Sequence, residues 1–155
     1  LPGYTEPMKS PVENKALVAK YPLILIAGTR SQVTFHSEHR MIPWLREKNQ
    51  WPLVDIHPED AEKYGVYDGE WVWLSNDQAQ VKRKVNITKT VRPGMLNTQH
   101  GWWMPEMEGA EPSLFGVWDY QVNQLTHGPQ QCSSGYGGGQ YKVTLVKIEK
   151  MAEVK

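Results

Sequence analysis

The first residues that could do chemistry follow an apolar stretch near the start of the chain. A glycine there would let a ligand approach the backbone, and an arginine guanidinium binds a phosphate through two parallel hydrogen bonds. Together with hydroxyl groups and free backbone amides, these residues indicate an anion site, although an ordinary turn with a surface arginine has the same composition. They are Gly28, Thr29, Arg30, Ser31 and Gln32.

A second polar group lies between residues 34 and 40. His36 and His39 are three positions apart, so on a helix they would share a face and could bind a metal ion. No acidic or cysteine partner stands in a position that would complete such a site. A hydrogen-bonding cluster around a polar ligand is a better interpretation than a metal site. An ordinary solvated surface remains the default interpretation. The group comprises Thr34, His36, Ser37, His39 and Arg40.

Two later segments carry flat or amide-bearing side chains. In the segment His100–Trp103, the paired Trp102 and Trp103 could stack on a flat ring or serve only as packing anchors. In the segment Asn123–Thr126, the asparagine and threonine could read the amide edges of a heterocycle or cap a helix.

The segment Gly135–Lys142 is rich in glycine. Its glycine spacing differs from the dinucleotide-binding fingerprint, and no Gly-Lys-Ser/Thr ends it as in a P-loop. It is therefore either a flexible hinge or a loop that folds over a ligand with Tyr141 and Lys142 at its rim. Cys132 has no histidine base in a recognisable motif, which argues against a catalytic thiol.

Short strands must position these segments. In Gln80–Thr88, for example, Val81 and Val85 alternate with Lys82 and Lys84, as is typical of a half-buried antiparallel strand. About six such strands, separated by turn signals, favour a mainly β barrel or sandwich. The predicted strands are Tyr21–Ala27, Trp51–Ile56, Glu70–Leu74, Gln80–Thr88, Met95–Thr98 and Tyr141–Ile148.

The clearest helix signature follows His57. Pro58 suits the first helical position, Glu59 and Asp60 suit the positive first turn, and Gly65 suits the position just after the helix end. We therefore predict a short helix that begins at Pro58 and ends before Gly65.

Composition excludes several classes of protein. The 155 residues carry 17 Lys and Arg against 17 Asp and Glu, and this zero net charge argues against a sequence-independent nucleic-acid binder. No apolar run approaches the roughly 20 residues needed to cross a bilayer. The single cysteine excludes an internal disulfide, a cysteine-based zinc site and a self-contained iron–sulfur cluster. The length fits one domain.

Charge is unevenly distributed along the chain. Pro93 through Tyr141 contains neither Lys nor Arg, and Gly101–Gly139 shows no period of a helix or a strand. Its aromatic residues argue against free disorder, so this long irregular loop is expected to pack on a cofactor or on a missing partner. A preceding basic stretch is interpreted as the solvated face of a strand and comprises Lys82, Arg83, Lys84, Lys89 and Arg92.

The order of these fragments resembles one family. An apolar strand runs into Gly-Thr-Arg at 28–30, and His-Pro-Glu-Asp-Ala at 57–61 leads to Gly-x-x-Asp-Gly at 65–69. Val-Arg-Pro-Gly at 91–94 then precedes His-Gly-Trp-Trp at 100–103, followed by Asn-Gln-Leu-Thr at 123–126 and Gln-Tyr-Lys at 140–142. From about Tyr21 to Glu149 the chain resembles the C-terminal molybdopterin-dinucleotide-binding domain of the dimethyl sulfoxide reductase superfamily. That superfamily includes formate dehydrogenases, nitrate reductases and polysulfide reductases.

The resemblance implies a six-stranded double-psi β-barrel with a few short helices. It also implies binding of the guanine-dinucleotide form of molybdopterin, within a molybdenum- or tungsten-dependent oxidoreductase whose cofactor is bis(molybdopterin guanine dinucleotide). Because the loop spacing varies in the family, Thr34 is an alternative to His36 in this set. The cofactor-binding residues that the resemblance implies are Gly28, Thr29, Arg30, His36, Ser37, His100, Asn123, Gln140, Tyr141 and Lys142.

The sequence also departs from the family pattern. The metal ligand and the iron–sulfur cysteines of many members have no counterpart here, so we expect neither catalytic residues nor metal ligands, and no catalysis by this chain alone. The expected partners are the remaining domains of a parent oxidoreductase, with an electron-transfer subunit as a further option. The resemblance is compatible with a cytoplasmic or a periplasmic prokaryotic location.

Residues 1–20 are expected to form a linker or lead-in, 21–150 the barrel, and 151–155 a tail. The alternative function is a stand-alone double-psi barrel that recognises a protein or a carbohydrate. Exposed aromatic side chains at Trp102, Trp103 and Trp118 would motivate that reading.

Overall fold

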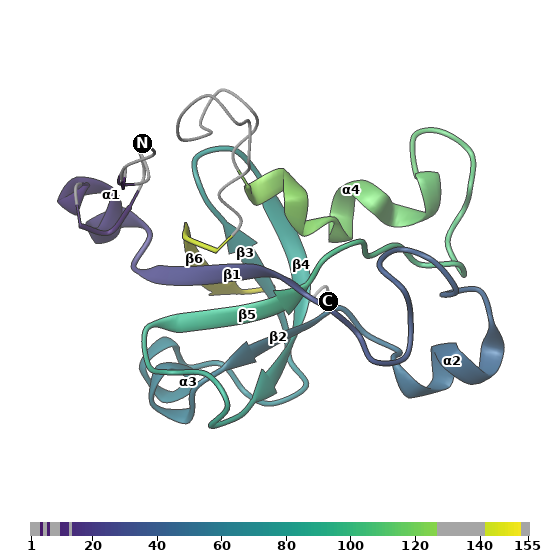
Figure 1. Cartoon of the computed structure of the whole chain (residues 1–155), viewed down its shortest axis with the longest axis horizontal. Helices are drawn as coiled ribbons and strands as arrows, with labels where there is room; N and C mark the ends of the chain where they lie inside the picture. Colours follow the sequence, from purple (N-terminus) through teal and green to yellow (C-terminus); the bar gives the residue numbers. More distant parts are fainter. Residues whose placement is uncertain (1–3, 5, 7–9, 13, 127–141, 153–155) are drawn as a thin grey trace.

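A closed β-barrel forms the body of the computed structural model, which describes residues 4, 6, 10–12, 14–126 and 142–152 (Figure 1). Neighbouring strands follow the order β1-β5-β2-β4-β3-β6, and pairing of β6 with β1 closes the barrel. The pairs β1·β5 and β2·β4 are parallel, and the remaining pairs are antiparallel. The strands are β1 (Leu23–Thr29), β2 (Leu53–Ile56), β3 (Trp71–Ser75), β4 (Gln80–Ile87), β5 (Met95–Gln99) and β6 (Thr144–Lys150).

This architecture confirms the predicted fold class. All six predicted strands form, with bounds that differ by a few residues, and the mixed pairing is consistent with the double-psi arrangement. The prediction began the last strand at Tyr141, a position outside the described residues, and β6 begins at Thr144.

Local signals account for helix α3 (Pro58–Tyr64). The imidazole of His57 accepts a hydrogen bond from the Glu59 N–H at 3.3 Å, which satisfies one of the free amides of the first turn. Gly65 ends the helix with a φ of +65°, a left-handed conformation that favours glycine. The predicted helix is thus confirmed at both ends.

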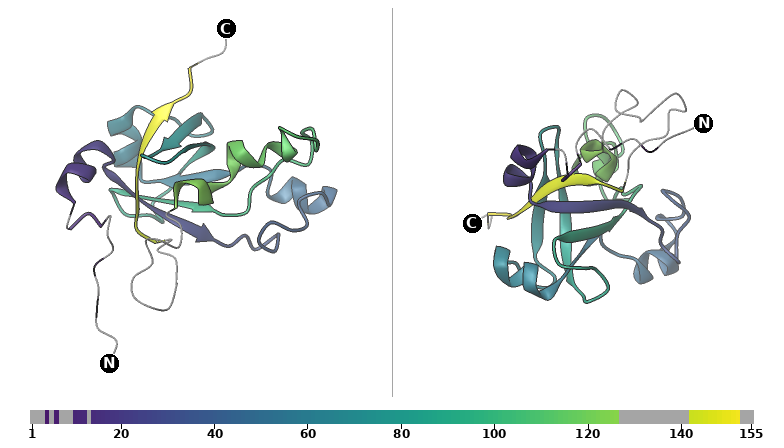
Figure 2. Two further views of the ribbon diagram at one scale, coloured as in Figure 1. Left: turned by 90° about the horizontal axis from the view of Figure 1, so that it is seen from above. Right: turned by 60° about the vertical axis from the view of Figure 1, so that its left-hand side comes forward.

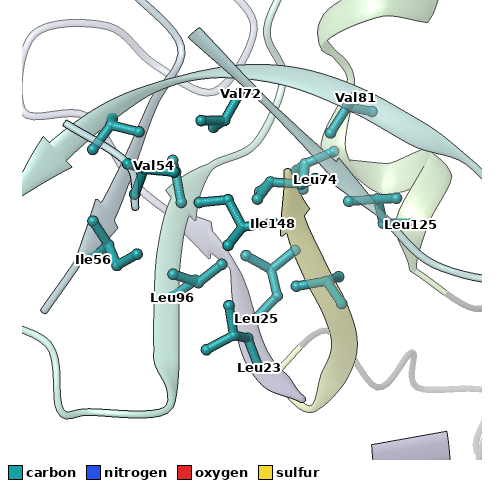
Figure 3. Packing of buried hydrophobic residues seen from close by; sticks show 14 of the residues in the cluster. Leu23, Leu25, Val54, Ile56, Val72, Leu74, Val81, Leu96, Leu125 and Ile148 are labelled. Carbon is teal, nitrogen blue, oxygen red and sulfur yellow. The ribbon is translucent and has the colours of Figure 1, made fainter. Parts of the chain in front are cut away.

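A cluster of buried apolar side chains fills most of the barrel interior (Figure 3). Leu25, Val54 and Leu74 come from three different strands and are fully buried, as are Val81 and Leu96. Each lies on the inward face that the two-residue period of its strand predicts. Burial of such side chains contributes about 25 cal/mol for each Å² of apolar surface removed from water.

The interpretation of the basic stretch as a solvated face is wrong for Arg83. Its side chain is fully buried on the same face of β4 as Val81 and Val85. The guanidinium donates to Thr98 Oγ1 at 2.8 Å and to the Tyr120 carbonyl oxygen at 2.7 Å. Burial lowers the pKa of Arg83 to about 9, with a further contribution from Arg40. The pattern of neighbouring charges could not reveal this, because the partners of Arg83 lie elsewhere in the chain.

Short helical elements surround the barrel. Helix α1 (Lys15–Lys20) lies in the predicted lead-in, and α2 (Pro43–Lys48) lies in the segment after β1. The long irregular loop forms η1 (Leu114–Gly116), α4 (Val117–Tyr120) and η2 (Val122–Leu125), which sequence periodicity did not predict. It folds on itself, since the Met104 N–H donates to the Phe115 carbonyl oxygen at 2.8 Å.

The loops that follow β1 and β5 extend from the same end of the barrel, away from α1 and α3 (Figure 2). This common direction follows from the parallel pairing of the two strands. Within the described ranges, no helix has both the length and the apolar character needed to cross a membrane.

Candidate functional site

A pocket of about 400 Å³ opens where β1 and β5 end. We call it the β1–β5 pocket. It brings together six of the ten predicted site residues, from four separate parts of the sequence. Its lining comprises Ala27, Gly28, Arg30, His36, His100, Asn123 and Lys142.

The pairing of β1 with β5 builds the pocket floor. Thr29 is opposite Gln99, so Arg30 and His100 emerge side by side after the two strands. The register shifts between Ala27 and Thr29, where Gly28 has a φ of +118°, a conformation that L residues with a Cβ rarely adopt. A Cβ at Gly28 would lie 4.0 Å from Lys142 Nζ and would occupy space inside the pocket.

His36 and His100 form a direct hydrogen-bonded pair. The Nδ1 of His36 lies 2.6 Å from the Nε2 of His100, and their ring centroids are 4.8 Å apart. Because two ring nitrogens share this bond, one imidazole donates while the other accepts. Burial lowers the pKa of His100, and His36, Arg30 and Arg40 lower it further through charge. These effects favour the neutral form of His100.

The loops that carry these histidines also touch through their backbones. Gly101 has a φ of +68°, and a Cβ there would lie 3.0 Å from the Ser37 backbone nitrogen. Trp103 Nε1 donates to the Ser37 carbonyl oxygen at 2.6 Å. Glycine at 101 is thus required both by conformation and by space.

The pocket is electrostatically one-sided. Arg30 and Lys142 are exposed cations, and Asn123 adds an uncharged amide from η2. No carboxylate is present among the described residues that line the pocket. Such a donor set suits a ligand that combines negative charge with hydrogen-bonding ring edges.

The other predicted site residues have different positions. Thr29 hydroxyl donates to Asn97 Oδ1 and so faces the neighbouring strand. Ser37 contacts Gly101 and Trp103, as described above, but is not part of the pocket lining. Thr34, the alternative to His36, is buried and also absent from that lining. Gln140 and Tyr141 lie outside the described residues, as do Cys132 and most of the glycine-rich segment.

The helical spacing considered for His36 and His39 does not arise, because residues 31–40 form a loop. His39 lies instead 3.9 Å from Glu38. Among the described residues, no group of three or more His, Cys, Asp or Glu side chains is arranged to hold a metal ion.

The paired tryptophans serve as packing anchors. Trp102 is fully buried, so it cannot offer a stacking surface, and Trp103 packs edge-to-face with Phe115 at 5.4 Å. Of the three tryptophans that motivated a recognition module, Trp118 has a largely exposed side chain, at 60%. The expectation of an exposed Trp102 is therefore wrong.

Sequence reasoning missed a second cavity of about 450 Å³ beside α2. Met104, Met107 and Tyr120 give it an apolar wall, and Trp51 and Arg46 complete much of its rim. Met104, Met107 and Tyr120 come from the long loop without a regular period, so nothing in the sequence indicated that they would meet Trp51 and Arg46.

The chain is similar to several known proteins. A family model described as "Molydopterin dinucleotide binding domain" matches residues 23–145. The chain is 38% identical over 137 residues to the dopamine dehydroxylase of Eggerthella lenta, an alignment that covers 87% of this chain and 13% of that protein. It is 32% identical over 115 residues to the acetylene hydratase of Syntrophotalea acetylenica, covering 74% of this chain and 16% of that protein.

A solved structure is similar over nearly the whole chain. Acetylene hydratase from Pelobacter acetylenicus superposes with a TM-score of 0.89 at 27% sequence identity, covering 97% of this chain and 21% of that one. Among these three proteins, the matched region never exceeds about a fifth of the relative's length.

Proposed function

Because the chain belongs to the molybdopterin dinucleotide-binding domain family, we propose that its β1–β5 pocket receives the guanine-dinucleotide form of molybdopterin. The domain assignment itself rests on the family match and on relatives among molybdopterin oxidoreductases. Beyond that assignment, we propose which residues bind the cofactor and that its nucleotide contains guanine.

One observation carries the proposal: six predicted residues converge on one pocket whose described lining lacks carboxylates. The cofactor is polyanionic and heterocyclic, so it needs cations for its phosphates and amides for its ring edges. Arg30 and Lys142 supply the first, and Asn123 supplies the second. Gly28 leaves room for a close approach to the backbone. The residues present therefore fit the group.

The chain's own contribution is binding and orientation. Arg30 and Lys142 neutralise phosphate charge, and Asn123 selects the orientation of a ring. The hydrogen-bonded His36–His100 pair adds two imidazole rings to the pocket lining. When bound, the cofactor's metal, molybdenum or tungsten, supplies the redox chemistry, which other domains of the parent must complete.

We further propose that the partners of this domain are the remaining domains of that parent oxidoreductase, with an electron-transfer subunit as an additional partner. The short coverage of the relatives supports this, since this chain corresponds to 13% of one relative and 16% of another. The recognition-module alternative has little support, because Trp102 is buried and the relatives are oxidoreductases and a hydratase.

The test is an analysis of the purified full-length parent. We expect bound molybdenum or tungsten by elemental mass spectrometry, and release of GMP when the extracted cofactor is hydrolysed. Release of another nucleotide would contradict the guanine form alone. A parent free of molybdenum, tungsten and pterin would overturn the function.

Variants of the parent enzyme test whether the cofactor binds in the β1–β5 pocket. Arg30→Gln combined with Lys142→Gln should lower the pterin content per polypeptide, because both changes remove a phosphate partner. Arg92→Gln is the matched control, since Arg92 is exposed and lies outside the pocket. Equal pterin content in all three proteins would show that the cofactor binds elsewhere.

A further inference from the structure

Arg40 is buried beneath the two loops that carry the histidine pair, with 1% of its surface exposed. Its Nε donates to the Gly101 carbonyl oxygen at 3.1 Å. One terminal nitrogen donates to the His36 carbonyl oxygen at 3.2 Å and reaches that of His100 at 3.5 Å. The guanidinium also stacks on Trp102, 3.8 Å from the ring centroid. A single side chain thus binds the backbones of both histidines.

Burial makes this arginine dependent on those carbonyl groups. No carboxylate of the described residues forms an ion pair with it, and its Nη1 atom has no hydrogen-bond partner among them. Burial, followed by repulsion from Arg46, lowers the pKa of Arg40 to about 10, so the group is still a cation at neutral pH. If either loop moved away, the buried charge would lose the dipoles that compensate its desolvation. The charge therefore holds the loops together.

The backbone geometry at this contact needs such support. His36 has a φ of +48°, and Gly101 has a φ of +68°. A residue with a Cβ, such as His36, keeps a positive φ only where its surroundings hold it. The two carbonyl groups that Arg40 binds most closely belong to these two residues.

Building on the proposed function, we propose that Arg40 is a positioning residue for the β1–β5 pocket. By binding the backbones of both loops, it fixes the spacing of the His36 and His100 imidazoles that line the pocket. Arg40 is itself absent from the pocket lining, so it acts on the ligand through the histidines. Arg30 and Lys142, in contrast, bind the ligand directly.

The test compares Arg40→Lys and Arg40→Gln with Arg92→Lys in the 155-residue chain. Lysine keeps the charge but cannot reach three carbonyl groups with one planar fork, and glutamine loses the charge. The readouts are the ¹⁵N chemical shifts and pH titrations of His36 and His100, and the affinity for diguanosine pyrophosphate. This diester stays ionised across the neutral range, so changes with pH belong to the protein.

We expect both Arg40 variants to abolish the nitrogen-to-nitrogen hydrogen bond of the histidine pair and to weaken binding of the probe about tenfold. The Arg92→Lys control should change neither readout. If folded Arg40→Lys keeps the histidine shifts and the affinity of the wild type, the proposal is overturned, even if its melting temperature falls.

The wild-type chain provides a test that does not depend on the folding of any variant. The Arg40 Nε–H should be protected from solvent exchange, and its resonance should shift together with those of His36 and His100 when the probe binds. A rapidly exchanging or unresponsive Nε–H would contradict positioning. If the wild type does not bind the probe, the pocket assignment fails, whereas the histidine shifts of the variants still test the role of Arg40.

Discussion

At the start of β5, the Gly94 N–H donates to Asp60 Oδ2 at 2.6 Å, and Asp60 belongs to a helix that its own sequence defines. At the end of β5, Gly101 instead meets Ser37 and Arg40, about sixty positions earlier in the chain. Both glycines have positive φ, +81° and +68°. The same strand therefore begins beside a locally encoded helix and ends in a site assembled from distant segments.

The comparison shows how the barrel separates stability from binding. Near α3, a helix with its own start and stop signals packs on the apolar core, to which Ala61 belongs. At the pocket end, two buried arginines, Arg40 and Arg83, hold loop carbonyl groups. Loops without local signals depend on such long-range polar contacts, which makes their geometry precise but sensitive to single changes.

The largest expected effect is a difference in probe affinity between alanine variants of the two glycines. Gly101→Ala should weaken probe binding by more than tenfold, because its Cβ would force the Ser37 backbone away and separate the histidines. Gly94→Ala is the matched control: Gly94 also has a positive φ, but nothing lies within 4 Å of the new Cβ. It should cost about 1–2 kcal/mol of stability without changing affinity. Calorimetry measures the affinity for the probe, and denaturant unfolding measures the stability. Equal affinity of the two variants would refute the proposed difference between the two ends of β5.

The next effect concerns stability at the α3 end. Asp60→Ala should lower the free energy of unfolding by about 1–3 kcal/mol, because the part-buried Gly94 N–H would lose its acceptor. Glu62→Ala, at an exposed position of the same helix, should have a much smaller effect. Probe affinity should stay that of the wild type in both variants. A loss of affinity in Asp60→Ala would show that the two ends are coupled.

The reverse pattern is expected for Arg30→Gln. Loss of a charge-assisted contact should weaken probe binding about tenfold, while stability should change by less than about 0.5 kcal/mol, because the side chain is exposed. Arg92→Gln, close to the other end of β5, removes the same charge from an exposed position. A similar loss of affinity in both variants would reduce the role of Arg30 to net charge.

The smallest expected effect is a pH dependence. The folded state lowers the pKa of His100, chiefly through burial, so the unfolded chain binds the proton more readily. The contribution of His100 is therefore fully present above the unfolded pKa of about 6.5 and is lost as the pH falls below it. Thermal unfolding between pH 7.5 and 5 should show this decline, and His100→Gln should flatten it. An unchanged slope in the variant would assign the decline to other groups.

The fold could be predicted largely from local patterns. Alternation defined β4, and Pro58 and Gly65 defined α3, because capping and side-chain period depend on near neighbours. The resemblance to a family then grouped Gly28, His36 and Asn123 before any geometry was known. Arg83 was misinterpreted, since its burial depends on Thr98 and Tyr120, which no local pattern connects to it.

By itself, the sequence determined the six strands, the helix after His57 and the segments that could bind an anion. Hydrophobic periodicity and helix caps depend on residues that are close in the sequence, so the sequence alone reveals them. The tertiary structure alone decided that His36 and His100 share a hydrogen bond, that Trp102 is buried and that Arg40 joins both loops. These contacts exist because parallel pairing of β1 and β5 brings the ends of the two strands together. About sixty residues separate the two strands in the sequence, and no local sequence pattern indicates that they pair.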